Sequence, residues 1–303
     1  MKVASGKPHY PSVKLIGFIG YVFLLSCNLM TGCKSGPVKD SNEPGNHLQQ
    51  KKLKGKVKTV TYYDFMANEY NGQVSRGRLD ALEVEQYDRQ GYMVAKVVYD
   101  NKHPKKIIDS FAYSNNGKGN PILTLRYNGD GSLYASYKYQ YNQAGLLKHM
   151  VRFTAKNFKH TEEFYTYSLD RLIEYKKLVY DAYTHIPDES KERYKYNEAG
   201  QNVETISFNK LTGKYYTSHL FEYDRFGNKV KETGTWADGR QHKTIWEYDD
   251  EGREVAHISI DIDGEYRSES RYLEFDSEGN WQILLYNSGG KLSQDFERRF
   301  TYY

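Results

Sequence analysis

The side chains with the clearest capacity for chemistry are carboxylates that recur beside glycines. Six stand in short turn-like segments: Asp224, Asp249, Glu251, Asp261, Asp263 and Asp276. Two carboxylates are enough for glycosidase chemistry, and gathered carboxylates can also bind calcium. An aspartate just before a glycine, however, hydrogen-bonds the backbone of a tight turn. We expect these six residues to serve turns, and a carboxylate-dependent hydrolase stays as the catalytic alternative.

Other catalytic and metal-binding patterns are missing from the sequence. It has no Gly-x-Ser-x-Gly elbow, no phosphate-binding glycine loop and no His-Glu-x-x-His pair. The histidines after residue 32 are spread along the chain without ligand spacing: His47, His103, His149, His160, His185, His219, His242 and His257. We expect no catalytic residue, no metal site and no cofactor, and therefore a protein that is not an enzyme.

Two aromatic residues are candidates for ligand binding. Trp236 and Tyr183 lie in or beside segments between expected strands, and residues 181–193 form the longest expected insertion. Loops carried on a rigid scaffold are frequent recognition sites, and aromatic rings stack well on sugar faces. Trp236 and Tyr183 are therefore candidate glycan-binding residues. The alternative is that both rings cover turn backbone.

The N-terminus is typical of a bacterial lipoprotein signal. Three lysines precede the apolar run 15–25, and Leu-Met-Thr-Gly-Cys follows at 29–33. The run is too short for the roughly twenty residues of a spanning helix. The resemblance makes Cys33 the lipidated residue and places the protein in the cell envelope, held on the membrane by its lipid. The residue after this cysteine is Lys34 and not aspartate, a pattern that resembles lipoproteins sent to the outer membrane.

Charge and cysteine content exclude other classes. The formal net charge is +4, and residues 1–32 hold three lysines and no acidic residue, so the mature chain carries 4 − 3 = +1. Such a balance gives no electrostatic reason to bind nucleic acid. Cys27 leaves with the signal and Cys33 carries lipid, so no thiol remains for a disulfide or a metal.

From about residue 54 the chain is a repeat array. The segment 221–228, Phe-Glu-Tyr-Asp-Arg-Phe-Gly-Asn, reads as a strand end, a tight turn and the next strand start. Versions of it place a key aromatic residue every 25 to 29 positions, at 87, 113, 141, 167, 196, 223, 248 and 275. A second turn lies between successive copies. Each repeat is therefore a hairpin of two strands.

Alternation predicts which face of each strand is aromatic. Pairs such as Tyr194 and Tyr196, or Phe221 and Tyr223, share one face, with polar residues between them. We assign Leu273 and Phe275 to the same aromatic face. After the turn, apolar residues step by three, as at Val203 and Ile206, which predicts either a β-bulge or a strand that is partly covered on both faces. Stacked repeats place like rings side by side, which accounts for thirty tyrosines.

The Tyr-Asp-x-x-Gly-Asn core at 223–228, with its relatives, resembles the tyrosine-aspartate repeats of the RHS family. The resemblance covers about residues 80–303 and is degenerate at the first and fourth units. It implies long antiparallel sheets that wind into a hollow shell. The family's Asp-Pro autocleavage signature is absent, and the chain stops inside a strand, so the resemblance implies the sheet and not toxin biology.

These observations predict three segments and one architecture. Residues 1–32 are a lipoprotein signal peptide, 33–50 a lipidated flexible tether, and 51–303 an all-β domain. The domain is an antiparallel meander of hairpin repeats in a strongly curved or closed single-layer sheet, with the aromatic face inward. A long extended solenoid is the alternative. We expect residues 57–65 and 79–87 to form a capping hairpin. The predicted function is a non-catalytic envelope module that is structural or binds an envelope protein, with a glycan-binding module for polysaccharide uptake as the alternative.

Overall fold

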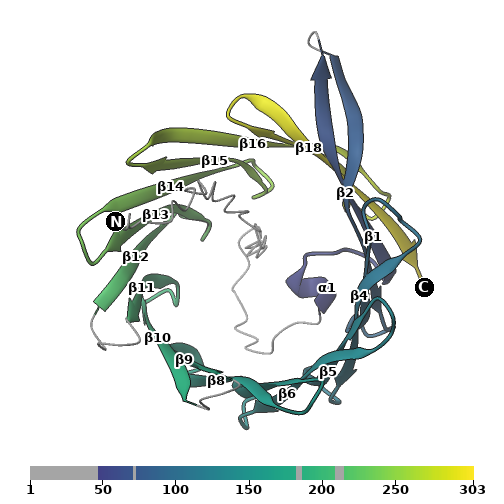
Figure 1. The fold of residues 1–303 in the computed structure, drawn as a ribbon. Helices are drawn as coiled ribbons and strands as arrows, with labels where there is room; N and C mark the ends of the chain where they lie inside the picture. Colours follow the sequence, from purple (N-terminus) through teal and green to yellow (C-terminus); the bar gives the residue numbers. More distant parts are fainter. Residues whose placement is uncertain (1–46, 71–72, 182–185, 209–214) are drawn as a thin grey trace, which may run out of the picture.

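The computed structural model describes residues 47–70, 73–181, 186–208 and 215–303. In this part of the chain, eighteen strands form one antiparallel sheet, in which each strand pairs with the next along the sequence. The first strand also pairs with the last, Val60 opposite Phe300, so the sheet closes on itself. Figure 1 shows the resulting ring. The prediction of an all-β meander of hairpin repeats is confirmed, and the sheet is closed.

The strands are β1 (Val57–Tyr70), β2 (Gln73–Tyr87), β3 (Met93–Tyr99), β4 (Ile107–Asn115), β5 (Pro121–Asn128), β6 (Leu133–Tyr141), β7 (Leu147–Thr154), β8 (Lys159–Ser168), β9 (Arg171–Tyr180), β10 (Pro187–Tyr196), β11 (Asn202–Phe208), β12 (Tyr215–Tyr223), β13 (Lys229–Trp236), β14 (Gln241–Tyr248), β15 (Glu254–Asp261), β16 (Gly264–Phe275), β17 (Trp281–Ser288) and β18 (Lys291–Tyr302). One short helix, α1 (His47–Gln50), precedes them. No helix in the described segments has the length and apolar character needed to cross a membrane.

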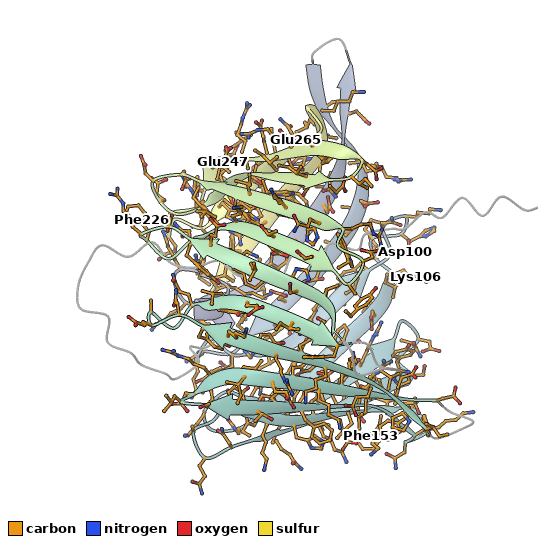
Figure 2. The ribbon with its side chains drawn as sticks, turned by 90° about the vertical axis from the view of Figure 1, so that its left-hand side faces the viewer. Asp100, Lys106, Phe153, Phe226, Glu247 and Glu265 are labelled. Atoms are coloured by element: carbon orange, nitrogen blue, oxygen red, sulfur yellow. The ribbon has the colours of Figure 1, made fainter. Side chains whose placement is uncertain are left out.

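The recurring turn has the geometry that its sequence predicts. Asp224 accepts hydrogen bonds from the backbone N–H groups of Phe226 at 2.8 Å and Asn228 at 2.9 Å. Gly227 has a φ of 89°, in the left-handed region that favours glycine. These turns gather at one rim of the ring and the second turns at the other, as Figure 2 shows for Phe226 at one rim and Asp100 and Lys106 at the opposite one.

A β-bulge follows each of these turns, as the apolar spacing predicts. Between β10 and β11, Lys195 pairs with Glu204 but Tyr196 pairs with Asn202, so Val203 is an extra residue. The same shift makes Val94 extra in β3 and Val255 extra in β15. Because bulges increase local twist and bend the strand, their regular return helps the sheet curl until its ends meet.

In the degenerate fourth unit, two residues other than glycine adopt the left-handed backbone conformation. Ser168 pairs directly with Arg171, and the two residues between them, Leu169 and Asp170, have φ values of 48° and 60°. Both lie in the left-handed region, as a two-residue hairpin turn requires. Loss of the glycine therefore shortens the turn without ending the strand pairing.

One strand departs from the predicted insertion. Residues 187–193, which the sequence places in a loop, belong to β10 and pair with β9 from Pro187 opposite Tyr180 to Arg193 opposite Glu174. The segment is polar on both faces, so it lacks the alternation of apolar and polar residues that predicts a strand. Ion pairs hold it instead: Lys191 bonds Glu174 at 2.7 Å, and Glu189 bonds Lys176 at 2.9 Å.

The assignment of Leu273 to the aromatic face is wrong. The β16–β17 register shifts between Tyr272 and Glu274, which leaves Leu273 as the extra residue. Leu273 is 48 % exposed, and the ring of Tyr272 contacts Trp281 with centroids 6.1 Å apart. A single bulge moved the aromatic position by one residue, which periodicity alone does not reveal.

The main buried cluster lies inside the ring, where α1 packs on the wall (Figure 1). Leu48 and Leu53 meet Val57, Val60, Tyr87 and Met93, and Tyr62, Tyr113, Phe300 and Tyr302 pack against them. Residues 47–50, which the sequence places in the tether, thus form a helix against the inner wall. Strands β1 and β2 do more than cap the array, because β1 closes the sheet by pairing with β18.

Candidate functional site

The inner wall of the barrel is the candidate functional surface. Tyr87 and Tyr113 face α1, which lies inside the ring, and directly paired residues of an antiparallel sheet share a face. Following the pairs around the sheet places the key aromatic residues on this wall. Only nine hydrophobic side chains are buried among the described residues. Barrels with this many strands are too wide for opposite walls to meet, so the inner wall is not filled by a core.

A repeated contact ties tyrosine hydroxyls to carboxylates on this wall. In the pattern Glu-x-Tyr, the hydroxyl donates to the glutamate two residues earlier, at 2.7 Å for Tyr87 and Glu85 and at 2.6 Å for Tyr194 and Glu192. Burial, and then the adjacent carboxylate, raise the pKa of both phenols above the ordinary value. These two phenols are therefore kept neutral, and their hydroxyls are oriented by the neighbouring carboxyl groups.

The key tyrosines make a second repeated contact, between neighbouring repeats. The hydroxyl of Tyr223 donates to the carbonyl of Asn202 at 2.7 Å, and that of Tyr248 to the carbonyl of Lys229 at 2.8 Å. Each carbonyl belongs to the residue just before a bulge, where the ladder is disrupted. Tyr141 and Tyr196 do the same. This contact gives the key position a reason to be tyrosine rather than phenylalanine.

The candidate ligand residues have different outcomes. Trp236 ends β13 and begins the turn to Arg240, whose backbone carbonyl accepts its N–H at 2.9 Å. Its ring is partly exposed and contacts the ring of His242 with centroids 4.9 Å apart, and the Arg240 guanidinium lies 5.5 Å from it. Tyr183 and Cys33 lie outside the described residues. The structure therefore places one of the two predicted binding residues.

The six turn carboxylates lie where turn chemistry predicts. Asp249 and Asp276 accept backbone N–H groups as Asp224 does, and Asp261 accepts the N–H of Asp263 at 2.8 Å. Burial acts to raise the pKa of Asp224, but hydrogen bonds from Asn228 and the turn backbone hold it below its ordinary value. Four of the six, Asp224, Asp249, Asp261 and Asp276, thus accept hydrogen bonds from the backbone of their own turns, which is the role expected for them, while Glu251 accepts a hydrogen bond from Arg253.

The fold also brings together three residues that sequence spacing does not connect. His219 of β12 and His242 of β14 both lie opposite Gly234 of β13. Glu232 Oε1 is 2.8 Å from His219 Nδ1 and 3.8 Å from His242 Nε2. Lys229 Nζ lies 3.1 Å from the other carboxylate oxygen. Burial works to raise the pKa of Glu232, but the His219 hydrogen bond and the Lys229 charge lower it to about 2.

The available sequence signal for this cluster is Gly234. An isolated glycine inside a strand marks a close approach of another group. A β-carbon built on Gly234 would lie 1.8 Å from His242 Cε1, so the imidazole occupies the space that a side chain would fill. Recognising the cluster requires the strand register, including the bulge between Glu222 and Tyr223.

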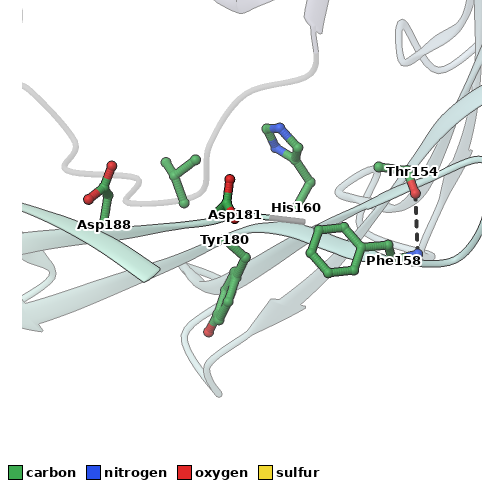
Figure 3. A pocket seen from close by; sticks show the side chains of 7 residues that line it. Thr154, Phe158, His160, Tyr180, Asp181 and Asp188 are labelled. Atoms are coloured by element: carbon green, nitrogen blue, oxygen red, sulfur yellow. Dashed lines mark hydrogen bonds between the residues drawn. The ribbon is translucent and has the colours of Figure 1, made fainter. Parts of the chain in front are cut away.

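A shallow hollow of about 360 Å³ lies at one end of β8, β9 and β10, beside the segment predicted as an insertion. Its lining includes Tyr180, Asp181, Asp188 and His160. Figure 3 shows Tyr180 pointing to the opposite side of the strands from His160, Asp181 and Asp188. The hollow follows the rim of the sheet and does not gather its polar groups around one point.

Comparisons with known proteins give remote structural matches. No protein-family model matches the chain, and no curated protein sequence matches it. A porin-like protein from Bacteroides uniformis is 10% identical over 81% of this chain and 98% of that chain, with a TM-score of 0.43. A porin-like protein from Bacteroides vulgatus is 12% identical over 82% and 98%, with a TM-score of 0.31. The TcdB2-TccC3-Cdc42 structure is 12% identical over 77% of this chain and 15% of that chain, with a TM-score of 0.37.

Proposed function

We propose that this protein is a non-catalytic, lipid-anchored module of the bacterial cell envelope that binds a polar ligand on the inner wall of its barrel. The signal-like N-terminus ending at Cys33 supports the anchor and an outer-membrane location. The Tyr-Asp-x-x-Gly pattern supports membership of the RHS-type repeat proteins. The partner through which the chain meets the membrane is its own lipid, and the ligand is a glycan or an envelope protein.

The observation that carries this proposal is the chemistry of the inner wall. Its aromatic rings are partly exposed, and its charges are already paired, as for Lys96 with Glu83 at 2.6 Å and Arg126 with Asp109 at 2.6 Å. Cross-strand contacts and hydroxyl bonds account for the stability that these rings contribute, and their exposed faces remain available for a ligand. Oriented phenols beside paired ions suit a ligand that is rich in hydroxyl groups.

A glycan is the ligand class that these residues favour, and Trp236 is the residue to test first. Ring faces stack on sugars while tyrosine hydroxyls and carboxylates accept or donate hydrogen bonds. The hydrolase alternative is less favoured, since the turn carboxylates are bound by local N–H groups. A binding role needs no such residues to be free.

The test is titration of the chain from residue 34 onward with a panel of envelope and dietary glycans, followed by tyrosine and tryptophan fluorescence. We expect saturable binding that weakens at least tenfold in Trp236→Ala and also in Tyr183→Ala. The matched control is Trp281→Phe, since the Arg298 guanidinium lies 3.5 Å from the Trp281 ring centroid and covers it. Silence across the panel, or equal loss in all three variants, would reject the glycan and favour a protein partner, to be sought by crosslinking in the intact envelope.

A further inference from the structure

We propose that His219, Glu232 and His242 form a binding site for one divalent transition-metal ion, of which Zn²⁺ is the representative, on the inner wall of the barrel. This inference is independent of the ligand proposed above. It rests on the geometry of three adjacent strands and on the kinds of donor atoms that they bring together.

The ligand atoms are close enough to share one ion. One nitrogen or oxygen from each of the three side chains lies within 4.8 Å of the others. Tetrahedral zinc with bonds of about 2.0–2.1 Å separates its ligand atoms by roughly 3.3 Å. The two separations to Glu232 Oε1, 2.8 Å from His219 and 3.8 Å from His242, stand on either side of that value. Side-chain rotations would also have to bring the two histidine nitrogens, which lie within 4.8 Å of each other, to that separation.

The backbone holds the two imidazoles in place before any ion arrives. Their rings meet edge to face beside Gly234, with centroids 5.5 Å apart. On one side the ring of His219 stacks on Phe221 with centroids 6.5 Å apart, and on the other the ring of His242 contacts Trp236. Aromatic contacts on both sides restrict the rings, so metal binding orders few additional groups.

One polar atom in the cluster lacks a partner. His242 Nδ1 is buried and makes no hydrogen bond, although buried polar atoms are ordinarily paired. A purely structural ion-pair network would leave this nitrogen unexplained. A metal bound through Nδ1 would give this atom a partner, whereas a metal bound through Nε2, the nitrogen that lies 3.8 Å from Glu232 Oε1, would leave it unpaired.

The donor set selects the class of ion. Two imidazoles and one carboxylate suit zinc, copper and nickel, whereas calcium and magnesium prefer oxygen ligands. Glu232 offers Oε1 to the site while Oε2 accepts Lys229 at 3.1 Å, so the carboxylate binds through one oxygen. Three protein ligands leave a fourth position for water or for an anionic group of a ligand.

The chain contains a matched comparison for this site. His149 Nε2 lies 2.9 Å from Glu162 Oε1, and Lys159 Nζ lies 2.7 Å from the other oxygen. Burial acts to raise the pKa of Glu162, but its hydrogen bonds lower it to about 2, as at Glu232. Here the hydroxyl of Tyr180 donates at 2.7 Å to the same Glu162 oxygen that Lys159 contacts, and among the described residues no second imidazole joins His149 at Oε1. The same His-Glu-Lys arrangement is thus present without the third metal ligand.

The experiment is calorimetric titration of the untagged protein with Zn²⁺, with Co²⁺ absorption as a second readout of coordination. We expect one Zn²⁺ per chain, affinity at least tenfold weaker in His219→Gln and in His242→Gln, and no change in His149→Gln. Tetrahedral Co²⁺ absorption should vanish in the same two variants. Absence of binding would overturn the proposal, and so would binding that survives His242→Gln, since that is adventitious binding only. If either variant unfolds, Glu232→Gln with the same titration gives the decision.

Discussion

Removal of the Lys51 ammonium tests how α1 is held inside the barrel. Glu85 is 2 % exposed, and its carboxylate accepts Lys51, the hydroxyl of Tyr62 at 3.1 Å and that of Tyr87 at 2.7 Å. Burial acts to raise the pKa of Glu85, but the charge and hydrogen bond of Lys51 bring it below its ordinary value. In Lys51→Met the largest opposing effect is gone, so we expect the pKa of Glu85 to move upward.

The size of the effect follows from the difference in burial between the partners. Breaking a fully buried pair costs about 3–5 kcal/mol. The Lys51 side chain is 36 % exposed and Glu85 keeps two hydroxyl donors, so we expect a loss of about 2–3 kcal/mol at neutral pH. The control is Lys231→Met, because Lys231 is also 36 % exposed but its partner Glu222 is 61 % exposed. That variant should lose less than about 1 kcal/mol.

The pH dependence separates a charge effect from lost packing. A depressed carboxyl pKa contributes stability that is present above the unfolded pKa and is lost as the pH falls through the folded pKa. A raised pKa in Lys51→Met has the opposite sign, so the stability gap to the wild type should widen as the pH rises from about 5 to about 8. Urea unfolding followed by tryptophan fluorescence measures the gap. A gap that is independent of pH, or equal to that of Lys231→Met, would refute the reasoning.

Three further perturbations test the repeat itself. Gly227→Val should lower the free energy of unfolding by about 1–3 kcal/mol, because the φ of Gly227 is 89°. The control is Gly117→Ala, since Gly117 has an ordinary φ and no atom lies within 4 Å of the added carbon. In the same denaturant melts this control should stay within about 0.5 kcal/mol of the wild type. A Gly227 loss below about 0.3 kcal/mol would contradict the turn assignment. Tyr223→Phe should lower the free energy of unfolding by about 1–2 kcal/mol, because it leaves the Asn202 carbonyl without its donor. The control Tyr134→Phe should be neutral, because the Tyr134 ring is exposed. Equal unfolding free energies of the two variants would remove the proposed reason for tyrosine at this position. Burial, and then the nearby charges of Asp80 and Asp295, raise the pKa of Asp64 to about 6. Asp64→Asn should therefore stabilise the fold by on the order of 1 kcal/mol above about pH 6 and have little effect near pH 4. Destabilisation at high pH would show that the charge of Asp64 is needed.

The features that sequence predicted well are those that each repeat specifies locally. The turn at 224–228, the alternation before it and the bulge at Val203 each depend on residues within one hairpin, and every copy repeats the signal. Strand number predicted strong curvature, because open twisted sheets of this size are rare, but it did not decide whether the sheet closes. The sequence does not show which strands pair to close the sheet, since β1 and β18 are distant in the chain.

The features that sequence missed depend on register or on non-local contacts. Strand β10 lacks alternation because ion pairs across to β9 replace apolar packing. Helix α1 has four residues, too few to form without the inner wall that covers Leu48. His219 and His242 are far apart in sequence and meet only because each lies opposite Gly234. Ligand spacing along the chain is a helix or loop criterion, and it does not detect residues aligned across strands.

Tyrosine hydroxyls in this wall bond either a glutamate or a backbone carbonyl. Because these bonds stabilise a barrel that has no filled core, other side chains remain available for binding. Hydroxyls such as that of Tyr248 bond the backbone of the preceding repeat, so adjacent units are held through the wall itself. Stability then accumulates between neighbours along the sheet, and closure removes the exposed edges. Side chains such as His242 and Trp236 are not required to fill a core. Replacing them should therefore affect ligand or metal binding more than folding, and this difference makes the proposed sites open to mutational test.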